Sequence, residues 1–89
     1  MRLEARIIGR VQGVFFRQFT YEKARELELT GFVRNEPDYS VYLVAEGGEK
    51  ALGELLEAVK KGPPAASVVR VEHSYSRSTG KFSEFRIER

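Results

Sequence analysis

The N-terminal segment alternates between apolar and charged positions. Leu3, Ala5 and Ile7 are separated by charged residues. A period of two is typical of a β-strand with one buried and one solvated face, because successive side chains point to opposite sides. The pattern predicts a strand that stops at Gly9 and a tight loop at Gly13, since glycine adopts a positive φ without steric cost.

From residue 16 onward, apolar residues recur at helical spacing. Phe16, Phe19, Ala24 and Leu27 stand among charged and polar neighbours, which predicts an amphipathic helix. We expect Gly31 to end this helix in the left-handed conformation that is common at helix C-termini.

The middle of the chain predicts a hairpin and a second helix. Residues 31–48 place strand-forming residues on both sides of the turn-forming sequence NEPD at 35–38, which indicates a β-hairpin. An apolar stripe then predicts a helix over about 49–61. The sequence GPP at 62–64 ends this helix, because proline cannot continue it.

Strand character returns over residues 66–77, and a short last strand is predicted around 82–87. One face of the longer strand is expected to hold Val69, Val71, His73 and Tyr75. The element order is β-α-β-β-α-β with a short terminal strand, the split βαβ arrangement of ferredoxin-like folds. We therefore predict a single α+β domain over 1–89, a ferredoxin-like βαββαβ sandwich whose antiparallel sheet of four to five strands carries two helices on one face.

Composition narrows the class of protein. The 89 residues leave room for one domain, and 42% hydrophobic residues are typical of a globular chain. A net charge of +2 is too small to indicate a nucleic-acid partner. The absence of cysteine favours a cytosolic protein. The N-terminus lacks the uninterrupted apolar run that a signal peptide or a membrane span requires. We expect a cytoplasmic monomer that binds neither nucleic acid nor membrane.

The loop before the first helix is the main candidate for chemistry. Residues 10–16 offer backbone N–H donors in a turn that leads into a helix N-terminus, where free amides and the helix dipole favour an anion. Arg17 follows with a guanidinium that can bind two phosphate oxygens. A purely structural interpretation of the same residues is open: the glycines turn the chain, Phe15 and Phe16 fill the core, and Arg17 is solvated. Neither nucleotide-binding glycine pattern is present.

The segments GRVQGVFFR at 9–17 and GFVRN at 31–35 resemble the acylphosphatase signature pair, G-x-V-Q-G-V-x-F-R and G-x-V-x-N. The resemblance extends along the chain to FSEFRI at 82–87. It implies an enzyme that hydrolyses the mixed anhydride of a carboxylic acid and phosphate, giving carboxylate and inorganic phosphate, without metal or cofactor. It further implies that Asn35 holds the attacking water and that the phosphoryl group binds to Val11, Gln12, Gly13, Val14, Phe15, Phe16 and Arg17.

One position departs from the family pattern. The family usually continues N-x-x-D-G after the second motif, whereas this chain has Tyr39 at the position of the glycine. The substitution affects the expected turn geometry of the hairpin more than the catalytic pair.

No residue is an obvious general base. His73 is the only histidine, and we expect it at a half-buried position on a distant strand, with no second soft ligand for a metal. Glu36 and Asp38 are interpreted as turn residues rather than an acid–base pair. The resemblance therefore implies that a phosphate oxygen of the substrate accepts the proton.

The alternative is a non-catalytic ferredoxin-like module that binds an anion or RNA. RNA-recognition domains share this element order and present aromatic residues on the open face of strands one and three. The first predicted strand offers Arg2, Glu4, Arg6 and Ile8 there, which argues against RNA. A further alternative is a domain that handles carbamoyl phosphate in a larger system, although a chain of this length is expected to act alone.

Overall fold

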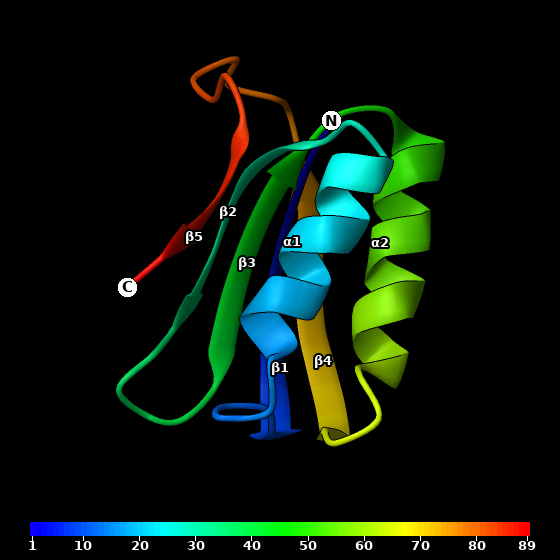
Figure 1. The fold of residues 1–89 in the computed structure, drawn as a ribbon. Coiled ribbons are helices and arrows are strands. Elements are labelled where there is room, and N and C mark those ends of the chain that lie inside the picture. Colours follow the sequence, from blue (N-terminus) through cyan, green and yellow to red (C-terminus); the bar gives the residue numbers. More distant parts are fainter.

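The computed structural model describes residues 1–89 and contains one five-stranded sheet with two helices. The elements are β1 (Arg2–Arg10), α1 (Phe16–Glu26), β2 (Thr30–Asn35), β3 (Val41–Glu46), α2 (Glu49–Lys61), β4 (Ser67–Ser76) and β5 (Phe85–Glu88). Figure 1 shows both helices on the same face of the sheet. The expected ferredoxin-like α+β arrangement is confirmed.

The sheet has the strand order β4-β1-β3-β2-β5. The four longer strands pair antiparallel, as expected, but β5 pairs parallel with β2. Because β4 and β5 lie at opposite edges, the chain crosses one end of the sheet between them (Figure 1). This crossing places the C-terminal residues beside β2 and the start of α1.

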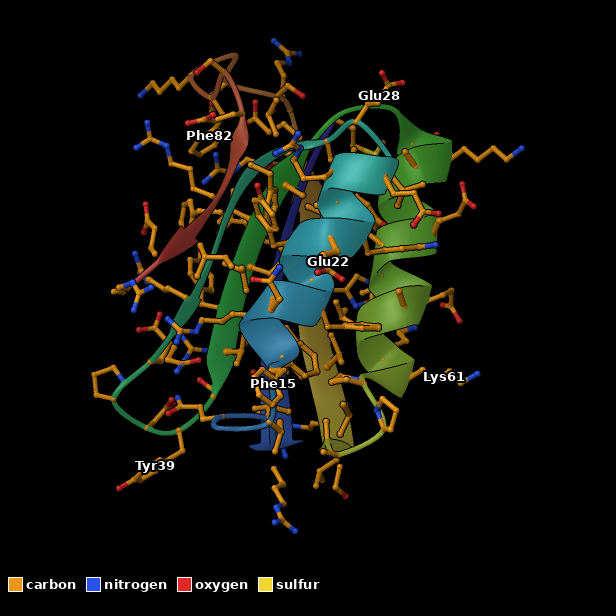
Figure 2. The ribbon with its side chains drawn as sticks, viewed as in Figure 1. Phe15, Glu22, Glu28, Tyr39, Lys61 and Phe82 are labelled. Atoms are coloured by element: carbon orange, nitrogen blue, oxygen red, sulfur yellow. The ribbon has the colours of Figure 1, made fainter.

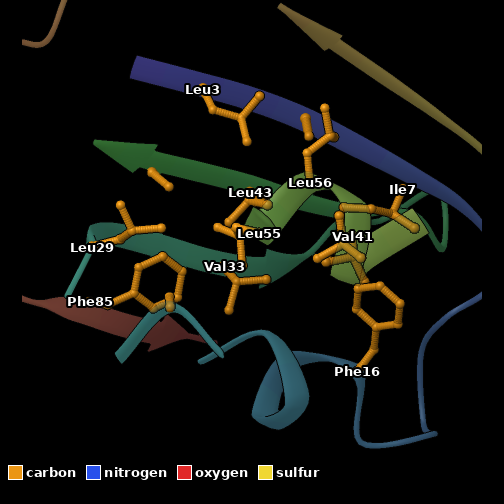
Figure 3. Packing of buried hydrophobic residues seen from close by; sticks show 14 of the residues in the cluster. Leu3, Ile7, Phe16, Leu29, Val33, Val41, Leu43, Leu55, Leu56 and Phe85 are labelled. Atoms are coloured by element: carbon orange, nitrogen blue, oxygen red, sulfur yellow. The ribbon is translucent and has the colours of Figure 1, made fainter. Parts of the chain in front are cut away.

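The core lies between the helices and the inner face of the sheet. Leu3, Ala5 and Ile7 of β1 are buried there, as their alternation predicts, and pack with the apolar stripe of α2 (Figure 3). Phe16, the first residue of α1, is also a core residue. Burial of Phe16 therefore anchors the loop that precedes α1.

The end of α1 differs from the prediction. Glu28, rather than Gly31, has the left-handed conformation, with φ of 58°, and the Leu29 N–H donates to the Ala24 carbonyl at 2.9 Å. Gly31 instead lies within β2, where a Cβ would overlap the carbonyl oxygen of Val44 on β3. This glycine is needed for close strand approach and not for helix termination.

The first strand continues past Gly9 to Arg10, and a β-bulge alters its pairing with β4. Ile8 pairs with Arg70 and Gly9 pairs with Val68, so Val69 has no partner and is 72% exposed. The prediction that Val69 shares a face with Val71 is wrong, because the inserted residue reverses the alternation.

In the C-terminal third, the expected burial of His73 is wrong, and the expected short last strand is present but starts later than predicted. His73 is exposed rather than half-buried, because it lies on the edge strand β4. The last strand begins at Phe85, and Phe82 lies instead on the outer face of the sheet, with its ring centroid 5.9 Å from that of Phe32. Neither helix is long and apolar enough to cross a lipid bilayer.

Candidate active site

A cleft of about 320 Å³ lies at the N-terminal end of α1. It is formed by the loop between β1 and α1, the first turn of α1, the end of β2 and the C-terminal residues. Its lining comprises Val11, Gly13, Phe15, Phe16, Arg17, Gln18, Asn35, Ile87 and Arg89. The structure thus brings Arg17 and Asn35, which the sequence separates, to one cleft, together with most of the loop residues singled out above.

The backbone of the loop alternates in the sign of φ. Gly13 has a φ of 74° and Phe15 a φ of 63°, while Gln12 and Val14 do not have positive φ. Such alternation is the pattern that turns successive N–H groups toward one concave side and forms an anion-binding nest. Gly13 is suited to this conformation because it lacks a Cβ.

The N-terminus of α1 has no internal cap. Phe15 occupies the N-cap position, no side chain hydrogen-bonds to the first turn, and the first turn has no acidic residue. Arg17 instead places a positive charge near the positive end of the helix dipole, an arrangement that is unfavourable until an anion binds. By contrast, α2 has Glu49 in its first turn.

Arg17 is held by the C-terminal strand. Its Nη1 donates to the backbone carbonyl of Glu88 at 3.0 Å. A guanidinium has several N–H donors, so this one hydrogen bond fixes the side chain and leaves donors for a ligand. The cleft lining contains a second arginine, Arg89, and no carboxylate side chain. The site therefore favours an anionic ligand.

Asn35 ends β2 and contributes its amide to the cleft. The Oδ1 atom is buried and has no hydrogen-bond partner in the protein. A buried acceptor that lacks a partner costs about 1–3 kcal/mol. Oδ1 is therefore an unsatisfied acceptor in a residue that lines the cleft.

Gln12 and Val14 do not line the cleft. The Nε2 of Gln12 donates to the carbonyls of Glu36 and Ser40, both at 2.9 Å. These carbonyls flank the turn of the β2–β3 hairpin, directly after Asn35. Sequence reasoning missed this positioning contact and that of Glu88, although the glutamine stands in the first signature motif.

The two neighbouring phenylalanines have opposite environments. Phe16 is buried, whereas Phe15 is 83% exposed. The interpretation of both as core residues is therefore wrong for Phe15, because its left-handed backbone turns the side chain away from the core. The side chain of Val11, which also lines the cleft, is buried in the core, so only its backbone groups can contact an anion.

Tyr39 keeps the turn geometry that glycine would favour. It has a φ of 73°, its N–H donates to the Glu36 carbonyl at 3.1 Å, and the Glu36 N–H donates to the Ser40 carbonyl at 2.9 Å. These contacts define a three-residue hairpin loop with a left-handed third residue. The Ser40 hydroxyl, followed by the Ser40 N–H, lowers the pKa of Asp38, so Asp38 is unsuited to be a general acid.

Comparisons with known proteins converge on one family. The family described as Acylphosphatase matches residues 3–87. An acylphosphatase of Salinibacter ruber is 52% identical over 99% of this chain and 93% of its own length. The crystal structure of the Bacillus subtilis acylphosphatase superposes with a TM-score of 0.95 at 39% identity, covering 99% of this chain and 98% of that one. Full-length HypF in a phosphate- and nucleotide-bound form gives a TM-score of 0.84 at 26% identity, over 98% of this chain and 11% of that one.

Proposed function

The chain belongs to the acylphosphatase family, and from that premise we propose how its cleft hydrolyses an acyl phosphate. The protein is an acylphosphatase, a hydrolase that releases a carboxylate and inorganic phosphate. The phosphoryl group binds to the N–H groups of loop 11–16 and to Arg17. Asn35 orients the attacking water.

The loop stabilises charge on the phosphoryl oxygens. Phosphoryl transfer passes through a loose transition state in which charge spreads over these oxygens, so catalysis depends on positioning and electrostatics. The nest around Gly13, the uncapped start of α1 and the guanidinium of Arg17 supply hydrogen-bond donors and positive charge to one cleft. Because Glu88 already fixes Arg17, little conformational entropy is lost when the anion binds.

The water is activated by orientation. The Oδ1 of Asn35 accepts one hydrogen bond from water and directs its oxygen toward phosphorus, in line with the departing carboxylate. The new P–O bond forms as the bond between phosphorus and the acyl oxygen breaks, and the carboxylate leaves with that electron pair. The proton of the water passes to a phosphoryl oxygen of the substrate. No general base, metal or cofactor is required.

One observation carries this proposal: Arg17 and Asn35 line one cleft that contains no carboxylate side chain, and the Oδ1 of Asn35 has no hydrogen-bond partner within the protein. The RNA-binding alternative has weaker support. Phe32 and Tyr42 do lie on the outer sheet face, but the guanidinium of Arg34 lies over both rings. Both rings therefore already contact a cation within the protein. Cytoplasmic location and a monomeric state stay predictions.

The proposal is tested with benzoyl phosphate hydrolysis in the presence of a chelator. The purified protein should hydrolyse it at the same rate with and without chelator. Arg17→Ala should lower kcat/KM by roughly 100-fold or more, because an oxyanion contact is lost. Arg25→Ala, which removes an exposed arginine from the last turn of the same helix, should leave the rate unchanged.

The variant Asn35→Ala separates the orientation of water from the binding of phosphate. It should lower kcat strongly while inhibition by inorganic phosphate changes little, because the water contact and not the phosphate contact is lost. Equal losses in both quantities would contradict the role in holding water. Full activity of Arg17→Ala would contradict the phosphoryl site.

A further inference from the structure

We propose that the ring of Phe15 forms an acyl-binding wall of the cleft and makes the enzyme selective for acyl phosphates with an aromatic or bulky apolar acyl group. This inference rests on the proposed function, because it assigns a binding surface to the acyl group of the proposed substrate.

Phe15 is an exposed apolar side chain at the cleft. Five large hydrophobic side chains are exposed, namely those of Met1, Phe15, Tyr39, Val69 and Tyr75, and Phe15 is the only one that also lines the cleft. With 83% of its surface accessible, the ring retains most of its apolar area for contact with a ligand. Figure 2 places Phe15 at the start of α1, and Tyr39 at the distant tip of the β2–β3 hairpin.

The exposed position of the Phe15 ring has two energetic costs. A left-handed conformation costs a residue with a Cβ about 1–2 kcal/mol, and an exposed phenyl ring gains nothing from the hydrophobic effect. Glycine at position 15 would avoid both costs, as Gly13 does at its own positive φ. Strain of this kind gathers at functional sites, where the surrounding structure enforces it.

The position of Phe15 suits the acyl group and not the phosphoryl group. Its backbone belongs to the loop that surrounds the phosphoryl oxygens, so its ring stands at the border of that site. Ile87 of β5, half-buried, adds apolar surface to the same cleft. An acyl chain that extends outward from phosphorus would therefore meet apolar side chains from the loop and from β5.

The test compares benzoyl phosphate with acetyl phosphate. The readout is the ratio of their kcat/KM values, because any disturbance of the shared phosphate loop affects both substrates and cancels in the ratio. Phe15→Asn removes the ring and keeps a residue that tolerates the left-handed region. The ratio should fall about tenfold, the amount expected when a ring-to-ring contact worth on the order of 1.4 kcal/mol is lost.

Two variants serve as controls. Phe15→Tyr keeps an aromatic ring and should keep the wild-type ratio. Tyr39→Asn makes the same kind of change at another exposed aromatic residue with positive φ, outside the cleft, and should also leave the ratio unchanged.

The outcomes separate the two proposals. If the wild type hydrolyses both substrates but Phe15→Asn keeps the wild-type ratio, the acyl-binding wall is wrong and the proposed function stands. A fall in the ratio for Tyr39→Asn of the same size would also overturn the inference. If the wild type hydrolyses neither substrate, the proposed function fails, and this inference fails with it.

Discussion

Phe15, Glu28 and Tyr39 are the residues other than glycine that hold a positive φ. Each occupies a place where the chain must reverse direction: the start of α1, the end of α1 and the β2–β3 turn. The fold imposes these conformations on residues that disfavour them, so each position stores strain. Only at Phe15 does the strained side chain line the cleft.

The strain at Tyr39 predicts a stabilising substitution. Tyr39→Gly should raise the free energy of unfolding by about 1 kcal/mol, because relief of the left-handed strain exceeds the added chain entropy of glycine in the unfolded state. Urea denaturation measures the change. Tyr75→Gly, on the regular strand β4, should instead lower stability. A loss of stability in Tyr39→Gly would show that its φ carries no strain.

Among the secondary-structure elements, the loop before α1, β2 and β5 form the site together, and a few hydrogen bonds connect them. The loop carries the N–H groups proposed to bind phosphate, β2 carries Asn35, and Gln12 links the loop to the hairpin that follows Asn35. Arg17 is linked in the same way to β5 through the Glu88 carbonyl. In the proposed mechanism, these links set the distance between the phosphoryl group and the attacking water.

Gln12 is therefore predicted to act as a positioning residue. Gln12→Ala should lower kcat about tenfold while inhibition by inorganic phosphate changes less, because the hairpin moves relative to the loop. It should also lower the free energy of unfolding by about 1–3 kcal/mol, since two hydrogen bonds are lost. Gln12→Glu, which has the same length but no donor at neutral pH, should behave like Gln12→Ala. A variant that loses stability but keeps full kcat would show a structural role alone.

At the scale of the whole molecule, Glu46 connects the N-terminal strand, β3 and the crossing segment that leads to β5. Its carboxylate accepts hydrogen bonds from Arg2 and from Thr79 and Gly80. Burial alone would raise the pKa of Glu46, but the hydrogen bonds from Thr79, Gly80 and Arg2 lower it to about 2. The crossing segment is thus anchored by one ionised side chain.

This pKa predicts loss of stability in acid. A carboxyl group whose pKa is lower in the folded state adds stability above its unfolded value of 4.5, and loses it as the pH falls toward about 2. The contribution is on the order of 3 kcal/mol at neutral pH. Denaturation of wild type and Glu46→Gln between pH 7 and pH 2 should show a stability difference that narrows below pH 4.5. A difference that does not depend on pH would contradict the assignment.

Local patterns along the chain were enough to predict the helices and strands and to recognise the family. The alternation of Leu3, Ala5 and Ile7 and the apolar stripes of the helices depend on neighbours along the chain, so the order of strands and helices could be predicted. The two signature motifs, likewise contiguous, indicated Arg17 and Asn35, which the fold brings to one cleft.

Three features became visible only in the folded chain: the parallel pairing of β5, the bulge at Val69 and the opposite environments of Phe15 and Phe16. The same is true of the hydrogen bond from Arg17 to the carbonyl of Glu88, which lies 71 residues further along the chain. The physical reason is that backbone hydrogen bonds between distant segments and left-handed conformations forced on unfavourable residues leave no periodic pattern in the sequence.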